Sequence, residues 1–152
     1  MTTHFTSGVT NVGAGSTLGR AKMLAPAKYH EYHNDFDTYL ASDWTITTTE
    51  GGSGNASEAL GDGDGGLLVI TNDDADNDND FLQLTKEGFK YEAGKQLAFN
   101  ARFKTSDADA SDVVMGLQIT DTSPLDVTDG VFFLLTDGST TLTFIVEKNG
   151  TQ

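Results

Sequence analysis

The sequence predicts an all-β protein, a two-sheet antiparallel sandwich preceded by an extended N-terminal arm. Three observations support this prediction. Short segments rich in β-branched and aromatic residues recur from about residue 36 onwards, and clusters of Asp, Gly, Ser and Pro separate them. No long stretch has the 3.6-residue apolar period of an amphipathic helix. With 152 residues, the chain is long enough for one such domain with a real core and too short for two ordinary ones.

Seven strands are expected along residues 36–152. They are Trp44–Thr49, Leu67–Thr71, Phe81–Leu84, Gln96–Lys104, Val113–Thr120, Gly130–Thr136 and Thr141–Glu147. The segment Gln96–Lys104 (QLAFNARFK) alternates apolar and polar residues and predicts a half-buried strand. The pair Asp137-Gly138 between the last two strands indicates a hairpin. Trp44, the sole tryptophan, opens an alternating strand, so we expect it in the core.

The N-terminal segment has a different composition, and we assign residues 1–35 to an arm and residues 36–152 to the sandwich. Apolar residues occur singly in the arm, with neither a sustained helical nor a sustained strand period. Ordering about 30 residues costs roughly 1–2 kcal/mol each in backbone entropy. Apolar burial near 25 cal/mol/Å² offsets that cost only with upwards of about 1,200 Å². The arm therefore either frays or orders on the surface of a partner.

Charge is divided between the two segments. Residues 1–30 contain Arg20, Lys22 and Lys28 and no acidic residue, whereas all 23 acidic residues lie in 31–152 with only six basic ones, which gives that part −17. An acidic body repels nucleic acid, because binding to nucleic acid depends on neutralising phosphates. The apolar runs are of strand length and too short to span a bilayer. We therefore expect neither a nucleic acid nor a membrane as a partner.

Two features that the sequence lacks indicate the compartment in which the protein is made. No cysteine occurs, so disulfides and thiolate metal sites are excluded, which fits a protein made in a reducing cytoplasm. The start, MTTHFTSGVTNVG, lacks the basic and apolar regions of a secretory signal.

The chain from about Trp44 to Gln152 resembles the concanavalin-like, laminin-G-like jelly-roll domains. The resemblance is carried by QLAFNARFK, by DVVMGLQITDTSPLDVTDGVFFLL and by TLTFIVEKNG. The whole chain, including the N-terminal arm, is similar to virion structural proteins of tailed phages, particularly marine phages that infect cyanobacteria. The resemblance implies a jelly-roll sandwich and a role in capsid decoration. The motifs that carry it are loose hydrophobic patterns and not catalytic signatures.

The chain departs from this family at its C-terminal end. Relatives of the fold usually continue past TLTFIVEKNG into further strands that close the sandwich, whereas this sequence stops at Gln152. Three explanations stay open: a compact variant of the fold, a longer natural polypeptide, or a neighbouring molecule that completes the sheet. The last follows from the tendency of an exposed edge strand to accept added pairing.

The segment 72–80, NDDADNDND, holds five carboxylates and is the candidate metal site. Asp74, Asp76 and Asp78 have the spacing that opens an EF-hand loop, but the expected glycine is Asn79 and the twelfth position is Thr85. A calcium site of another kind is one interpretation, and a solvated turn between strands is the other. Asp62 and Asp64 are poor additional ligands, because they precede the strand that the acidic segment follows.

The segment YHEYHND offers a second candidate for metal binding. His30 and His33 share a face only in a helix, and zinc needs a further ligand such as Asp35 or His4. Surface or interface histidines are the alternative interpretation. The aromatic residues around them favour docking of this hinge onto the body, or an interface; they are Tyr29, Tyr32, Phe36 and Tyr39.

No catalytic residues are predicted. A glycosidase needs two carboxyl groups about 5–10 Å apart across the scissile bond, and Glu147 is the single acidic residue among the four expected strands QLAFNARFK, VVMGLQIT, GVFFLLT and LTFIVE. The sequence also lacks a nucleophile elbow, a Walker loop and a dinucleotide fingerprint. We therefore expect a non-enzyme without a required cofactor, calcium being the one candidate.

Taken together, these features predict a structural protein of the virion, assembled in the host cytoplasm, whose arm binds the major capsid protein, copies of itself, or both. The arm residues expected to contact the shell are Phe5, Val9, Val12, Leu18, Arg20, Met23 and Leu24. The alternative is a lectin-like module that binds host surface glycans, with the loops NDDADNDND and DTSPLDVTDG as recognition elements and calcium as a possible organiser.

Overall fold

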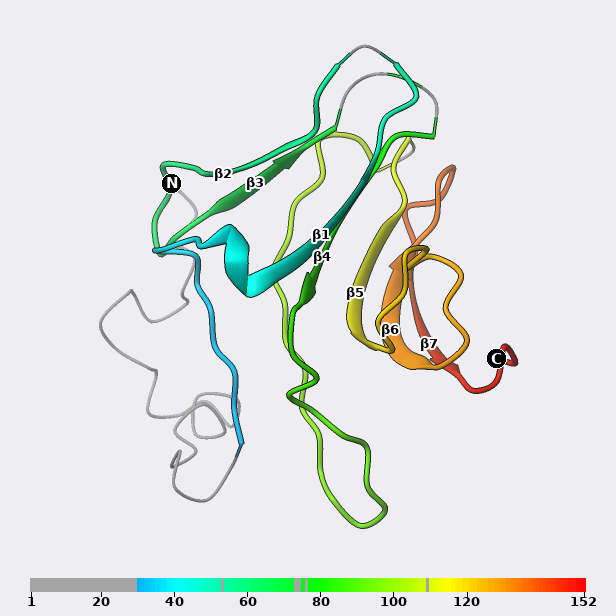
Figure 1. The fold of residues 1–152 in the computed structure, drawn as a ribbon. Helices are drawn as coiled ribbons and strands as arrows, with labels where there is room; N and C mark the ends of the chain where they lie inside the picture. The colour runs from blue at the N-terminus through cyan, green and yellow to red at the C-terminus, as the bar shows by residue number, and fades with distance from the viewer. Residues whose placement is uncertain (1–29, 53, 73–74, 76, 109) are drawn as a thin grey trace. The chain divides into compact units, whose positions relative to one another are not determined.

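The computed structural model describes residues 30–52, 54–72, 75, 77–108 and 110–152. Two compact units divide the chain, Met1–Leu82 and Gln83–Gln152. Figure 1 draws the elements, which are strands apart from one short 3-10 helix, η1 (Ala41–Asp43). Within the described part of the chain, no helix has the length and hydropathy needed to cross a bilayer. The arm residues 1–29 lie outside the described residues, so the arm stays a prediction.

The first unit contains two small sheets. Strands β1 (Trp44–Thr49) and β4 (Asn79–Leu84) form one of them, and the last two residues of β4 already belong to the second unit. The other is an antiparallel pair of β2 (Ser57–Leu60) and β3 (Leu68–Thr71), in register from Ser57 opposite Thr71 to Leu60 opposite Leu68. A glycine-rich turn joins β2 to β3, with the Gly61 N–H donating to the Leu67 carbonyl at 2.8 Å.

The second unit contains a three-stranded antiparallel sheet, coloured yellow to red in Figure 1. Its strands are β5 (Val113–Gln118), β6 (Gly130–Leu135) and β7 (Leu142–Glu147), in the order β5-β6-β7. The turn between β6 and β7 closes with a hydrogen bond from Ser139 N–H to the Thr136 carbonyl at 3.0 Å, and Gly138 has a φ of 74°. The predicted hairpin at Asp137-Gly138 is therefore confirmed.

One face of the three-stranded sheet carries the core. Phe132 and Ile145 lie opposite each other on β6 and β7 and are buried together with Val127 of the preceding loop. Val114 and Leu134 on the same face pack against them. The loop is held down by Gln118, whose Nε2 donates to the Pro124 carbonyl at 3.0 Å. The continuous apolar runs of β6 and β7 thus bury one set of alternate side chains under residues 119–129.

The all-β class and the antiparallel pairing are confirmed, and antiparallel sheets of this kind are the components of a β-sandwich. The jelly-roll connectivity stays a prediction. Strand β1 has the predicted bounds, and five other predicted strands differ from β3–β7 by one or two residues.

Three predictions were wrong. Residues 96–104 form no strand and pair with no other strand among the described residues. Strand β2 was missed, because SEAL contains Glu and Ala, which are poor strand formers, and its pairing with β3 decides its conformation. Trp44 is half-buried and is not part of the buried core.

Candidate functional sites

The acidic segment ties β4 to the end of β1. Asp78 accepts a hydrogen bond at Oδ1 from the backbone N–H of Gly51, and Asp80 accepts one at Oδ1 from the Thr48 hydroxyl at 3.0 Å. Both contacts are made by side chains that the sequence places two residues apart, on one side of the strand. In the described part of the segment, the carboxylates therefore act as cross-strand hydrogen-bond acceptors.

The calcium prediction rests on residues of which only one is described. Asp74 and Asp76 lie outside the described residues, and Asp78 is engaged by Gly51. Among the residues that the structure does describe, no group of three or more His, Asp or Glu side chains is arranged to hold a metal ion. Asp62 and Asp64 are exposed in the turn between β2 and β3. The calcium site stays a prediction.

A pair of carboxyl groups lies beside this segment and was not predicted. Glu58 of β2 lies against Asp80 of β4, and the side-chain hydrogen bond to Asp80 raises the pKa of Glu58, helped by partial burial and by the negative charge of Asp80. Burial, and then the charges of Glu58 and Asp80, also raise the pKa of Tyr39. The Tyr39 hydroxyl is buried and has no hydrogen-bond partner among the described residues.

This carboxyl pair does not have the geometry of a glycosidase. The two groups hydrogen bond directly, whereas even a retaining glycosidase needs about 5 Å between its carboxyl groups for the scissile bond. Two carboxylates this close repel each other when both are ionised, which favours the protonated form of Glu58, the member whose pKa is raised.

One histidine of the hinge lies near a carboxylate. His33 Nε2 lies 3.9 Å from Asp35 Oδ2, and the His33 side chain is largely open to solvent whereas Asp35 is half-buried. Residues 30–40 contain no helix, so the face that His30 and His33 were to share does not form. The remaining candidate ligand, His4, lies outside the described residues. The structure therefore gives the zinc interpretation no support in the described residues.

Aromatic rings gather around Trp44. Phe36 stacks on Trp44 with ring centroids 6.3 Å apart, and Tyr32 meets it edge-on at 6.3 Å. Phe36 has a φ of 59°, rare for a bulky residue, and Asn34 fixes that turn by accepting the Phe36 N–H at 2.8 Å. Tyr32 of the hinge thus contacts the body, as one of the two interpretations expects. Tyr29 lies outside the described residues, and the interface interpretation stays a prediction.

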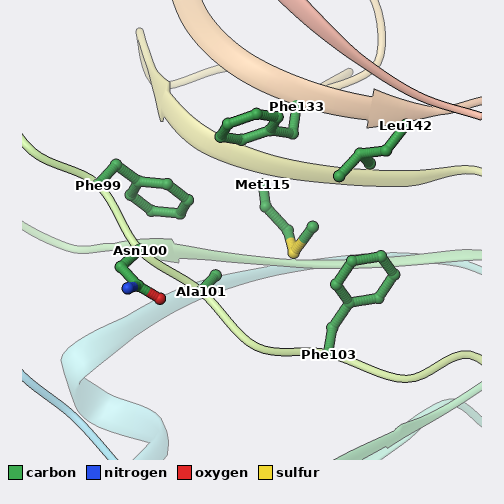
Figure 2. Close-up of a pocket in the computed structure, with 7 residues that line it drawn as sticks. All are labelled: Phe99, Asn100, Ala101, Phe103, Met115, Phe133 and Leu142. Carbon is green, nitrogen blue, oxygen red and sulfur yellow. The ribbon is translucent and has the colours of Figure 1, made fainter. Parts of the chain in front are cut away.

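The second unit contains a pocket of about 220 Å³. Its lining residues, shown in Figure 2, are Phe99, Asn100, Ala101, Phe103, Met115, Phe133 and Leu142. We call residues 96–104 the strap, and four of its residues between 99 and 103 form one wall of the pocket. The face of the three-stranded sheet opposite the core forms the other wall. The ring centroids of Phe99 and Phe133 lie 6.5 Å apart. The strap therefore lies over this face of the sheet, and the pocket is the space left between them.

The sequence held a signal for this pocket. The alternation in QLAFNARFK places Leu97, Phe99, Ala101 and Phe103 on one side, and that is the side from which Phe99 and Phe103 reach the sheet. Ligand-binding pockets usually combine an apolar lining with a few polar groups that orient the ligand. A pocket lining without such a set of polar groups is typical of a packing surface. Asn100 is the single polar residue of the lining.

The residues predicted to contact a shell, from Phe5 to Leu24, all lie outside the described residues. Comparisons with family models, with curated proteins and with solved structures found no match to this chain. The function must therefore be argued from the residues of the chain itself.

Proposed function

We propose that the protein is a structural component of a tailed-phage virion that decorates or stabilises the capsid. In this proposal the arm, residues 1–35, anchors the protein to the shell, and the acidic β-rich body, residues 36–152, faces solvent. The observation that carries the proposal is the division of charge: residues 1–30 hold three basic residues and no acid, and the remainder carries −17. A basic, glycine-dotted segment on an acidic body is suited to binding a surface that the body itself avoids.

The arm would bind through its singly spaced apolar residues, with Arg20 adding a charge contact. Such a segment pays for its ordering at the moment of binding, so each copy binds weakly for the area it covers. Many copies on a symmetric shell, or copies joined to one another, raise the effective concentration of each arm and supply avidity. The shell partner in this proposal is the major capsid protein, and the proposal includes no catalytic step.

The test is co-sedimentation with purified capsids. A chain lacking residues 1–30 should keep the far-ultraviolet circular dichroism of the body and lose binding to capsids. The triple variant Leu18→Ala/Met23→Ala/Leu24→Ala should weaken binding about tenfold or more, since truncating interface anchors usually costs above 1 kcal/mol each. The matched control is Leu40→Ala/Leu60→Ala/Ile70→Ala, which truncates exposed apolar residues of the body. Capsid binding by the shortened chain, or its unfolding, would contradict the anchoring role.

A carbohydrate-binding role is the second candidate, and the position of Trp44 favours it. This ring is half-buried and belongs to a cluster with Tyr32, which is itself exposed. A partly exposed aromatic ring offers an apolar face on which a ring of a ligand can stack. Because Trp44 is the sole tryptophan, its fluorescence would report glycan binding directly. Titration with host surface glycans that changes this signal, and that Tyr32→Ala weakens, would favour this role over capsid decoration.

A further inference from the structure

The strap has the sequence of a strand, but its backbone has no strand partner in the described part of the chain. Its apolar side chains alternate with polar ones over nine residues. No backbone hydrogen bond joins residues 96–104 to any other described segment. Phe99 and Phe103 point toward the sheet in Figure 2, yet each is still 42% exposed. Unpaired backbone groups along an extended apolar segment favour the addition of a strand.

Strand β7 likewise has backbone groups without a strand partner in the described part of the chain. It is the last strand in the order β5-β6-β7, so no described strand pairs with one edge of its backbone. Leu142 to Val146 include no charge and no proline, which are the devices that normally block added pairing at an edge. The bonds of residues 148–151 that follow join the chain back to itself and to Thr128, beyond the end of β7.

The strap covers only part of the face on which it lies. The register places nine apolar residues on this face, which are Val113, Met115 and Leu117 of β5, Val131, Phe133 and Leu135 of β6, and Leu142, Phe144 and Val146 of β7. The strap lies against Met115 and Phe133 and reaches the start of β7. Farther along β7, Phe144 and Val146 remain 58% and 57% exposed. A strip over β7, next to the strap, is therefore uncovered.

We infer that a second copy of this chain covers that strip, in a reciprocal two-fold arrangement. The β7 strand of each copy lies over the β7 strand of its partner and beside the partner's strap. Each strap thereby gains a neighbouring strand, and each open edge of β7 gains a strap. The result is a sandwich in which both layers contain the three-stranded sheet of one copy and the strap of the other. Phe144 and Val146 then face the same residues of the second copy.

Side-chain directions and charges agree with this pairing. The strap carries Arg102 and Lys104 and no acid, and β7 carries Glu147 and no base. With Phe99 and Phe103 facing the sheet, the alternate residues Arg102 and Lys104 face outward. In the partner's β7, Phe144 and Val146 face inward, so Glu147 faces outward as well. Opposite charges thus meet on one side of the layer, while the uncharged side chains meet inside it.

The size of the contact predicts a weak dimer. The exposed parts of Phe99, Phe103, Leu142, Phe144 and Val146 amount to roughly 400 Å² per copy, if a whole Phe covers about 200 Å² and Leu and Val somewhat less. Two copies bring roughly 800 Å², against about 1,200 Å² for a specific interface. The backbone of the two strap–β7 pairs must supply the rest. We therefore expect dissociation constants in the micromolar range.

Sedimentation equilibrium of the full chain across the micromolar range tests the dimer. The wild type should form dimers, and Val146→Lys should weaken association about tenfold or more, because it places a charge in an apolar contact. Ile70→Lys is the matched control, since Ile70 is a similarly exposed strand residue of the first unit. Circular dichroism checks that both variants fold. A wild type that stays monomeric, or equal association by Val146→Lys, overturns the inference.

Cross-linking tests which strands meet. The chain has no cysteine, so Asn100→Cys and Thr143→Cys chains each carry one thiol at an exposed position of the strap or of β7. When the two chains are mixed and treated with a short bifunctional thiol reagent, the heterodimer should predominate. A product dominated by the Thr143→Cys homodimer would mean that β7 pairs edge to edge with β7, and would overturn the reciprocal arrangement. Dimers without any strap-to-β7 product would do the same.

Discussion

Every buried residue in the described part of the chain lies in the unit Gln83–Gln152, and none lies in Met1–Leu82. The second unit has a core in which Phe132 is 2% exposed under the loop that carries Val127. The first unit is held by polar contacts instead, such as those of Asp78 with Gly51 and Asp80 with Thr48, and by the rings around Trp44.

The difference follows from how the apolar residues are arranged, because acidic residues are about equally frequent in the two units, 13 in residues 1–82 and 10 in residues 83–152. The runs VVMGLQ, GVFFLL and LTFIV of the second unit contain no charged residue, whereas β2 and β4 each contain one acidic residue. Burying apolar area is the main source of stability in a domain. The comparison indicates that the stability of the second unit depends on its apolar core. The stability of the first unit depends on the backbone conformation of its turns and on the ionisation of its side chains.

The largest expected effect is the loss of the core of the second unit. Phe132→Ala should lower the free energy of unfolding of this unit by about 3–5 kcal/mol, because it removes a buried ring and leaves a cavity. Phe144→Ala on the neighbouring strand, where the ring is largely exposed, should cost about 1 kcal/mol or less. Urea unfolding followed by circular dichroism, at concentrations where the chain is monomeric, measures both. Equal losses would show that Phe132 is not the centre of a core.

An intermediate effect is expected at Gly66, on which the geometry of the first unit depends. Gly66 has a φ of +81°, and a Cβ there would lie 1.9 Å from the carbonyl oxygen of Asp35. Gly66→Ala should therefore destabilise the first unit by about 2 kcal/mol, from backbone strain and displacement of residues 35–37. The fluorescence of Trp44 follows this unit during unfolding.

The matched control for that variant is Gly63→Ala. A Cβ at Gly63 would meet only the Leu67 side chain, at 3.5 Å, which is an ordinary contact. We expect a change within about 0.5 kcal/mol, as for other surface positions. If Gly63→Ala and Gly66→Ala unfold alike, the close approach of residues 35–37 to the glycine-rich turn does not stabilise the unit.

The smallest effect concerns pH. The pKa of Glu58 is raised, chiefly by its hydrogen bond to Asp80, so the folded state holds the proton more tightly than the unfolded state does. This stabilisation is complete below the ordinary pKa of 4.5 and is lost as the pH rises through the raised value. Glu58→Gln should therefore flatten the decline in melting temperature between weakly acidic and neutral pH. Trp44 fluorescence during heating measures it.

Glu87→Gln controls for the removal of one negative charge, because Glu87 is an exposed residue of the second unit. It should leave the slope of melting temperature against pH unchanged. If both variants change the slope equally, the general repulsion within an acidic chain, and not the Glu58–Asp80 pair, sets the pH dependence.

Several features could be read from the sequence because they are local. The hairpin at Asp137-Gly138 follows from two residues that favour a tight turn, and β1 follows from alternation within WTITTT. The carboxyl pair could not be read in this way. Glu58 and Asp80 are 22 residues apart, on strands of two different sheets, and no periodic pattern connects them.

By itself, the sequence determined the all-β class, most strand positions, the division of charge and the alternating side chains of residues 96–104, since these depend on composition and on side-chain period. Only the tertiary structure decided that residues 96–104 pair with no strand, that Ser57–Leu60 does pair, and that one face of the β5-β6-β7 sheet is buried while the other stays partly open. The physical reason is that a strand is completed by backbone hydrogen bonds to a partner. Its own residues give the direction of its side chains but do not supply that partner.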